Sequence, residues 1–307
     1  MATIGGAGLA VAGGVAVVIA LAGRWDEGRR ALAGAEALWL VVALALAAMA
    51  MVAIAWPWSD VMAVLGTRVP RARALAWYFV GELGKYVPGG VWTVVGRAEQ
   101  AAGAGLDRSV AYAGVALSLV AAYLAAIGVA VALVPVASGG GVPLAVVALL
   151  PAGMVALHPR ILQPMLGLVR RLVRRPLAVE VPPWGACAAL VARYVPAWLM
   201  VGTATWCVAR GLDPDADLGR VALAGVLSWI VGLLAVPVPG GLGVREAVFV
   251  SAAGLPLATG AATAVLARLA FMVVDAAGAL LGAAALRRRV GTMAMTVAEA
   301  DDGHGSA

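Results

Sequence analysis

Charged residues stand inside apolar stretches of this sequence, where they are costly unless they bind a ligand or neutralise one another. Glu82, Lys85 and Arg97 surround one Val-Pro-Gly-Gly tetrapeptide, and Arg245 and Glu246 closely follow a second. In lipid, such charges face the protein interior and are candidates for function by default. We expect the cations to bind an anionic group, while the carboxylates balance those cations or accept protons.

Three more charges lie in other apolar runs. Arg268 and Asp275 are seven residues apart, which is about two helical turns and places both on one face. Arg193 lies in the run before the second tetrapeptide. We include all three among the substrate-binding candidates.

A structural interpretation of these charges stays open. Arg245 pairs in that case with Glu246 or Asp275, and Lys85 pairs with a neighbouring carboxylate, Glu82. Mutual neutralisation of this kind satisfies the charges without any ligand.

The two Pro-Gly-Gly turns are themselves candidate binding elements. Pro88, Gly89 and Gly90 form the first turn; the second is formed by Pro239, Gly240 and Gly241. Proline ends the incoming helix, and the glycines permit a tight reversal. The outgoing helix then begins with free N–H groups and a positive dipole end, a combination that binds phosphate. The alternative is a purely structural turn between packed helices.

Aromatic residues flank the same elements. Tyr86 and Trp92 are close to the first turn and are expected to line a cavity. The remaining aromatics near these elements are expected to anchor the chain at the membrane interface: they are Trp77, Tyr78, Tyr194, Trp198 and Trp229. Lys85 and Arg97 have a competing role, since their long stems allow the charges to reach the same interface.

The composition requires lipid as the solvent. Of 307 residues, 63% are hydrophobic and 12% are charged, and the mean hydropathy is +0.98. A soluble domain carries roughly 25% charged residues. The net charge of +6 does not indicate nucleic acid binding, because the basic residues lie in loops between apolar runs and form no basic face. We predict a multi-pass protein of the cell (plasma) membrane.

Metal, cofactor and enzyme signatures are not found in the sequence. Cys187 and Cys207 are about 30 Å apart if one helix joins them, too far for a disulfide. His158 and His304 are isolated. We therefore expect no metal and no cofactor, and we find no catalytic signature.

The predicted fold is all-α, with about six transmembrane helices and two re-entrant helical hairpins. A spanning helix needs about 20 apolar residues. Runs of suitable length, although the fourth is short, are Thr3–Gly23, Glu36–Trp56, Ser109–Ala137, Val142–Leu157, Trp184–Ala209 and Ala258–Leu286. The hairpins are expected at about 74–104 and 221–255. Residues 1–289 would form one domain, and 290–307 a disordered cytoplasmic tail.

The two hairpins are related by an internal repeat. Three short matches share an offset of 151 residues without a gap. They pair Val80–Leu83 with Val231–Leu234, Val87–Gly90 with Val238–Gly241, and Ala101–Gly103 with Ala252–Gly254. We infer an internal duplication.

Arginine placement predicts the topology, since cytoplasmic loops carry the excess of basic residues. If each hairpin enters and leaves on one side, thirteen arginines lie inside and five outside, with both termini cytoplasmic. Three full helices then separate the hairpins, so they enter from opposite faces as an inverted repeat, as in many transporters. The alternative is eight ordinary helices, two of them kinked by Pro-Gly.

Two segments resemble one protein family. They are Gly84–Trp92 (Gly-Lys-Tyr-Val-Pro-Gly-Gly-Val-Trp) and Pro237–Glu246 (Pro-Val-Pro-Gly-Gly-Leu-Gly-Val-Arg-Glu). Both are similar to the lysylphosphatidylglycerol synthase transmembrane family, also called flippase-like, and the likeness extends from about residue 35 to 289. The best-understood members join this domain to an aminoacyl-transferase domain, and their membrane part is held to move the lipid between leaflets. We see no such second domain and expect translocation alone.

The resemblance and the charges together predict a lipid flippase. Its partner would be a lipid with an anionic headgroup (a phospholipid, a glycolipid or a polyprenyl-phosphate-linked lipid) that enters a polar cavity between the hairpins. Two alternatives stay open: a membrane-embedded lipid-modifying enzyme, and a non-transporting partner of a glycosyltransferase. A homo-oligomer is compatible with each of them.

Overall fold

The protein is helical throughout the part of the chain that the structure, a computed structural model, describes. That part comprises residues 35–87, 91–138, 151–155, 157–161, 181–234, 241 and 243–304, with the single residues 33 and 163. No strand occurs among these residues. The all-α prediction is confirmed.

Four described helical segments are long and apolar enough to cross a membrane. They are Ala37–Val64, Arg108–Ala137, Trp184–Leu212 and Leu257–Arg288. Each matches one of the six predicted spans. The other two predicted spans, 3–23 and most of 142–157, lie outside the described residues.

The spans are built from α3 (Ala37–Ala55) continued by α4 (Trp58–Val64), α7 (Arg108–Ser138), α10 (Trp184–Leu212) and α13 (Leu257–His304). Four shorter elements complete the described fold. They are α5 (Arg71–Glu82) with the 3-10 turn η1 (Leu83–Tyr86), α6 (Trp92–Gly103), α11 (Leu218–Leu234) and α12 (Val244–Ala252).

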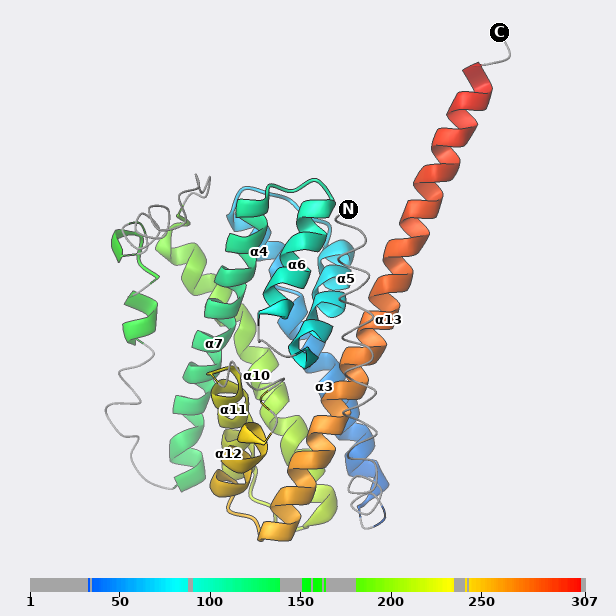
Figure 1. The fold of residues 1–307 in the computed structure, drawn as a ribbon. Coiled ribbons are helices and arrows are strands. Elements are labelled where there is room, and N and C mark those ends of the chain that lie inside the picture. Colours follow the sequence, from blue (N-terminus) through cyan, green and yellow to red (C-terminus); the bar gives the residue numbers. More distant parts are fainter. Residues whose placement is uncertain are drawn as a thin grey trace.

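These shorter elements form two opposed hairpins. In Figure 1, α5 and α6 lie side by side in the upper half of the molecule, and α11 and α12 lie in the lower half. The α4–α5 and α6–α7 connections and the start of α10 are at the upper end. The start of α3 and the α10–α11 and α12–α13 connections are at the lower end. The re-entrant depth of the hairpins in the bilayer and their relation as an inverted repeat stay predictions.

Glycines allow the elements to approach closely. Gly202 of α10 faces Ala222 of α11, where an added Cβ would lie 3.1 Å from the Ala222 carbonyl oxygen. On α13, Gly282 similarly faces the backbone of Ala76 in α5 at 3.0 Å. Small residues serve this purpose in membranes, where van der Waals packing rather than the hydrophobic effect holds helices together.

The two arms of the first hairpin approach closely at η1. A Cβ on Gly84 would lie 2.5 Å from the backbone carbonyl carbon of Trp92, so the incoming and outgoing chains touch at the glycine. The second hairpin closes in a related way, since Gly241 has a left-handed φ of 66° and lies against Gly232. Residues 88–90 and 235–240 lie outside the described chain.

The prediction that the flanking aromatics anchor the chain at the interface is wrong for four of them. Trp77, Tyr78, Tyr194 and Trp198 are buried in the protein core, each at most 3% exposed. Trp198 donates from its indole N–H to the Ala122 carbonyl at 2.6 Å, which satisfies its one polar group. These rings pack in the core between α5, α7 and α10.

Helix α13 continues to His304, well beyond the bundle in Figure 1. This stretch includes most of the segment 290–307 for which the sequence predicts disorder. The cytoplasmic location and the disorder of that segment stay predictions.

Candidate functional site

Two cavities lie where the hairpins meet. The upper cavity, of about 130 Å³, is lined by residues of the first hairpin, α7, α10 and α11, among them Glu82, Arg97 and Tyr123. A smaller lower cavity, of about 40 Å³, is lined by the second hairpin, α10 and α13. Three residues line both cavities and therefore separate them. They are Lys85, Trp229 and Arg245.

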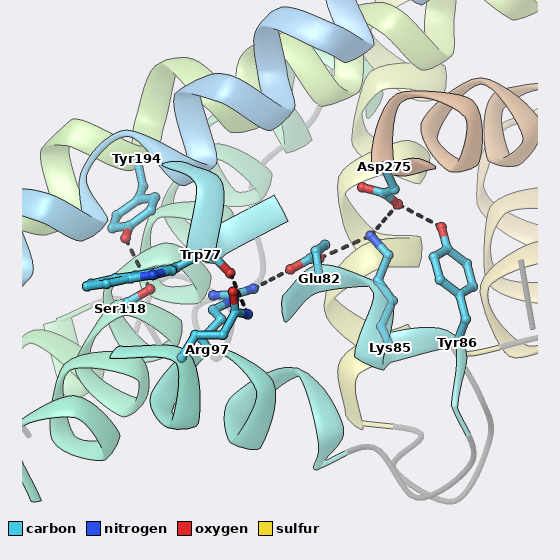
Figure 2. A network of polar contacts seen from close by, with 9 residues as sticks. Trp77, Glu82, Lys85, Tyr86, Arg97, Ser118, Tyr194 and Asp275 are labelled. Atoms are coloured by element: carbon cyan, nitrogen blue, oxygen red, sulfur yellow. Dashed lines mark hydrogen bonds and ion pairs between the residues drawn. The ribbon is translucent and has the colours of Figure 1, made fainter. Parts of the chain in front are cut away.

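A continuous polar network ties the first hairpin to α13 (Figure 2). Lys85 lies between two carboxylates, with its Nζ 3.0 Å from Glu82 Oε1 and 2.6 Å from Asp275 Oδ2. The Tyr86 hydroxyl donates to the same Asp275 oxygen at 2.7 Å, and Arg97 pairs with the other Glu82 oxygen. Two cations and two carboxylates therefore balance. Since Asp275 is fully buried and belongs to α13, the network holds η1 and α6 against that helix.

Helix α13 holds the second hairpin by a separate pair. Arg268 Nη1 lies 2.8 Å from Glu246 Oε1 at the start of α12. The other Glu246 oxygen accepts the Gly243 backbone N–H at 2.7 Å, so one carboxylate caps α12 and anchors it to α13. Asp275 and Arg268 thus serve opposite hairpins from one face of one helix.

Arg245 has a different environment. Its guanidinium carbon lies 3.9 Å from the centre of the Trp229 ring, a cation–π contact. Its aliphatic stem crosses Gly232, where any Cβ would collide with it. Among the described residues, no carboxylate forms an ion pair with Arg245. The charged residues that line or border the two cavities are four cations and three carboxylates, and Arg245 carries the excess positive charge.

The same arginine–aromatic–glycine arrangement occurs in the first hairpin. Arg97 lies 3.9 Å from the Tyr78 ring centre, and its stem packs on Gly81. Tyr78 and Gly81 correspond to Trp229 and Gly232 at the repeat offset of 151 residues. Both hairpins therefore place an arginine from the outgoing helix across an aromatic ring and a glycine of the incoming helix.

The two copies differ at one position that carries a charge in the first copy and none in the second. Glu82 neutralises Arg97, but its counterpart at the offset of 151 residues is Leu233. Leu233 lines the upper cavity, as Arg245 does. The second copy thus lacks the counter-ion that the first one has, which explains why the excess charge falls on Arg245.

Most of the sequence-predicted residues that the structure describes meet at these cavities. That group comprises Glu82, Lys85, Tyr86, Arg97, Gly241, Arg245, Glu246, Arg268 and Asp275. Trp92 contributes its backbone to the tight contact with Gly84. Pro88, Gly89, Gly90, Pro239 and Gly240 lie outside the described residues.

Arg193 lies elsewhere. Its Nη1 is 2.5 Å from Asp60 Oδ2, in a groove formed by α3, α4, α5 and α10 on the outside of the bundle. The position of a charge within an apolar run could not tell an inward-facing arginine from one on the outer surface.

The structure also decides between alternative roles for the other charges. Lys85 and Arg97 do not reach an interface, since the Arg97 side chain is 2% exposed and that of Lys85 is 16% exposed. The predicted Lys85–Glu82 pair is confirmed. The structural interpretation pairs Arg245 with Glu246 or Asp275, but Glu246 forms an ion pair with Arg268 and Asp275 forms one with Lys85.

The sequence prediction missed Trp229, Tyr78 and Leu233 as site residues. A signal for all three was present in the repeat at the 151-residue offset. Leu233 lies within the tetrapeptide Val231–Leu234, and Tyr78 and Trp229 each lie two residues before the start of their tetrapeptide. Comparing the two copies position by position identifies the aromatic pair and the Glu82-to-Leu233 difference.

A protein-family model described as the lysylphosphatidylglycerol synthase TM region matches residues 6–282. The match covers most of the chain, including both hairpins and most of the spanning part of α13. The chain belongs to this family. A comparison with curated proteins finds no significant match. As a lysylphosphatidylglycerol synthase TM-region protein with four described membrane-spanning segments, the chain is a multi-pass membrane protein.

Proposed function

We propose that this family member moves a lipid with an anionic, phosphate-bearing headgroup between the two leaflets. The headgroup passes through the upper and lower cavities while the tails stay in lipid. The observation that carries the proposal is the excess charge of Arg245, at the junction of the two cavities and without a carboxylate partner among the described residues.

Electrostatics favours this assignment. A phosphodiester anion that enters hydrocarbon loses its hydration, which makes the uncatalysed crossing very slow. A site with one surplus positive charge becomes neutral when it binds a single anion. The planar guanidinium of Arg245 suits a phosphate because its N–H donors can bind two oxygens together. The nearby Lys85 offers a second donor at the same junction.

The attachment of both hairpins to α13 supports a mechanism for alternating access. Asp275 holds the first hairpin and Arg268 holds the second, through separate ion pairs. A small shift of α13 relative to the rest of the bundle would therefore move the hairpins together. Trp229, which lies under both Arg245 and Lys85, is the barrier that a headgroup must pass. Among the described residues, none donates a hydrogen bond to the buried Asp275 Oδ1, so this oxygen is available to a proton or a water molecule during the cycle.

A leaflet-sidedness assay tests the proposal. The full chain is reconstituted into liposomes that contain fluorescent phosphatidylglycerol, and a membrane-impermeant reductant bleaches the outer leaflet. We expect the wild-type protein to accelerate loss of the inner-leaflet signal over empty liposomes. Arg245→Gln is expected to lower that rate at least about tenfold, because a bond to a charged group contributes about 1.5–3 kcal/mol.

Arg210→Gln is the matched control. Arg210 also lies over a tryptophan ring, that of Trp39, at 5.9 Å, but lines neither cavity. It should transport like the wild type. A wild-type rate equal to that of empty liposomes overturns the proposal, and so does equal loss of rate in both variants. Chemically altered lipid, detected by mass spectrometry, would identify a lipid-modifying enzyme instead.

A further inference from the structure

A groove on the outside of the bundle has its own charged end. It runs between α3, α4, α5 and α10 and has a volume of about 750 Å³, within the range of small-molecule sites. None of its lining residues lines the upper or the lower cavity. The groove is therefore a separate feature of the surface that the family's translocation role does not use.

Two arginines form the charged end. The side chains of Arg193 and Arg71 are 54% and 58% exposed, and both approach Asp60, with N–O distances of 2.5 Å and 3.7 Å. One carboxylate between two guanidinium groups leaves a net charge of +1. Each guanidinium has five N–H donors, so the single carboxylate leaves most of them free for an anion. Arg71 also lies 5.1 Å from the Trp56 ring centre, which sets one wall of this end.

The rest of the groove is apolar. Met49, Val52 and Trp56 of the first span line it at helical spacing and are between 41% and 50% exposed. They cover about 10 Å of helix length. Met200 of α10 lines the opposite wall. A protein surface that faced water would not expose such a stripe, whereas lipid tails solvate it.

The polar and apolar parts are ordered along the membrane normal. In Figure 1, α3 rises from the lower end toward α4, and the α4–α5 connection is at the upper end. Asp60 on α4 and Arg71 at the start of α5 are therefore nearer the upper end than Met49, which is within α3. On the opposite wall, Arg193 precedes Met200 as α10 descends. A bound amphiphile would have its anionic part at the upper end and its tail toward the middle of the bundle. The sequence predicts that the upper end is cytoplasmic, the side where anionic phospholipids concentrate in many membranes.

We infer that this groove binds one phospholipid with an anionic headgroup, held by Arg71 and Arg193 at its phosphate and by α3 and α10 along an acyl chain. The bound lipid does not enter the cavities between the hairpins. It occupies the groove between α10 on one wall and α3, α4 and the start of α5 on the other.

Native mass spectrometry of the full chain tests the inference. The protein is purified in a neutral detergent and titrated with dioleoylphosphatidylglycerol or dioleoylphosphatidylcholine. Arg245→Gln removes the cation of the central site, so an anionic lipid still retained by that variant reports the groove. We expect this variant to retain phosphatidylglycerol at least about tenfold more tightly than phosphatidylcholine. Arg245→Gln/Arg193→Gln is expected to lose that preference.

Two further variants keep the test sharp. Asp60→Asn in the Arg245→Gln background removes the ion pair but keeps both arginines, and should retain phosphatidylglycerol. Arg71→Gln in that background covers the case in which Arg193→Gln fails to fold. Arg71 is the more exposed arginine and forms the longer pair with Asp60, so its loss should leave the fold intact and weaken phosphatidylglycerol binding. Tail-free glycerol phosphate should not compete.

The inference is overturned if phosphatidylglycerol and phosphatidylcholine bind equally to Arg245→Gln. Full competition by glycerol phosphate would also overturn it, because that result identifies an ion site rather than a lipid site. Loss of the preference for phosphatidylglycerol in Arg245→Gln/Asp60→Asn, which keeps both groove arginines, would overturn it too. None of these outcomes bears on transport, which is measured separately in liposomes.

Discussion

Arg245 stacks on Trp229 with 3.9 Å between the guanidinium carbon and the ring centre, and no carboxylate of the described chain completes an ion pair with it. Arg97 makes the same contact with Tyr78 in the other hairpin, but there Glu82 supplies the carboxylate. The two copies of the repeat thus separate two roles. The first copy forms a neutral pair of buried side chains, Glu82 and Arg97, called the neutral clamp below, and the second copy holds Arg245, where we propose that the headgroup binds.

A carboxylate introduced near Arg245 should neutralise its charge and abolish lipid binding there. In Leu233→Glu, the new carboxylate is introduced at the position that corresponds to Glu82 by the 151-residue offset. Leu233 and Arg245 line the same cavity, so the carboxylate is expected to neutralise Arg245. We expect phosphatidylglycerol transport in liposomes to fall at least about tenfold. Leu233→Gln adds a polar group of similar size without the charge and is expected to transport at close to the wild-type rate.

The contrast between these two variants is the decisive readout. Equal rates in Leu233→Glu and the wild type would show that the charge of Arg245 is not used. Equal loss in both variants would point to the size or polarity of the side chain instead, since only the glutamate carries a charge.

Removing the carboxylate of the neutral clamp should lower the stability of the fold rather than change which lipid the protein transports. In Glu82→Gln, the buried Arg97 and the adjacent Lys85 lose their shared carboxylate, a change that costs about 3–5 kcal/mol in buried pairs. We expect a marked fall in the thermal unfolding midpoint in detergent, followed by tryptophan fluorescence. Glu99→Gln is the control, because Glu99 pairs with the mainly exposed Arg108 and such pairs contribute about 0–1 kcal/mol.

Removing both members of the clamp gives the opposite test. Glu82→Leu/Arg97→Leu leaves no unpaired buried charge on either partner and should recover part of the stability lost in Glu82→Gln. A double variant less stable than the single one would mean that Arg97 contributes through its stem and the Tyr78 ring more than through its charge.

The gathering of charges at the hairpins was predictable from the sequence for a physical reason. A residue such as Asp275 in an apolar run must find a partner inside the protein, because lipid offers none. The Pro-Gly-Gly repeats indicated where the chain reverses, so charges near them were expected to converge. The all-α fold and four of the spans followed from hydropathy alone.

The identity of partners that are far apart in the sequence was not predictable. Asp275 binds Lys85 and Tyr86, which are about 190 residues away in the sequence, and helical periodicity carries no information about such contacts. Arg193 shows the same limit in reverse. Its apolar neighbours in sequence resemble those of Arg268, yet one arginine faces the outer groove and the other faces the second hairpin.

The tight turn of the first hairpin should not tolerate a side chain at Gly84. A Cβ there would lie 2.5–2.7 Å from backbone atoms of Trp92 and Thr93, and backbone cannot rotate away as a side chain can. We expect Gly84→Ala to lower the unfolding midpoint clearly. Gly103→Ala, at the end of α6, meets nothing within 4 Å and should be neutral or slightly stabilising. A Gly84→Ala protein as stable as Gly103→Ala would contradict the close approach of η1 and α6.

The opposed entry of the hairpins can be tested by cysteine labelling in oriented membrane vesicles. The native Cys187 and Cys207 are buried and should react poorly. If α5 and α6 return to the same face, cysteines at Arg68 and Ala104 label from one side with an impermeant maleimide. Positions Asp215 and Ser251, which flank the second hairpin at the lower end, then label from the other side. Labelling of Arg68→Cys and Ala104→Cys from opposite sides would instead mean that this stretch crosses the membrane as one kinked helix, and the inverted repeat would be wrong. Because the arginine excess predicts the cytoplasm at the upper end, the first pair should react in inside-out vesicles and not in right-side-out ones.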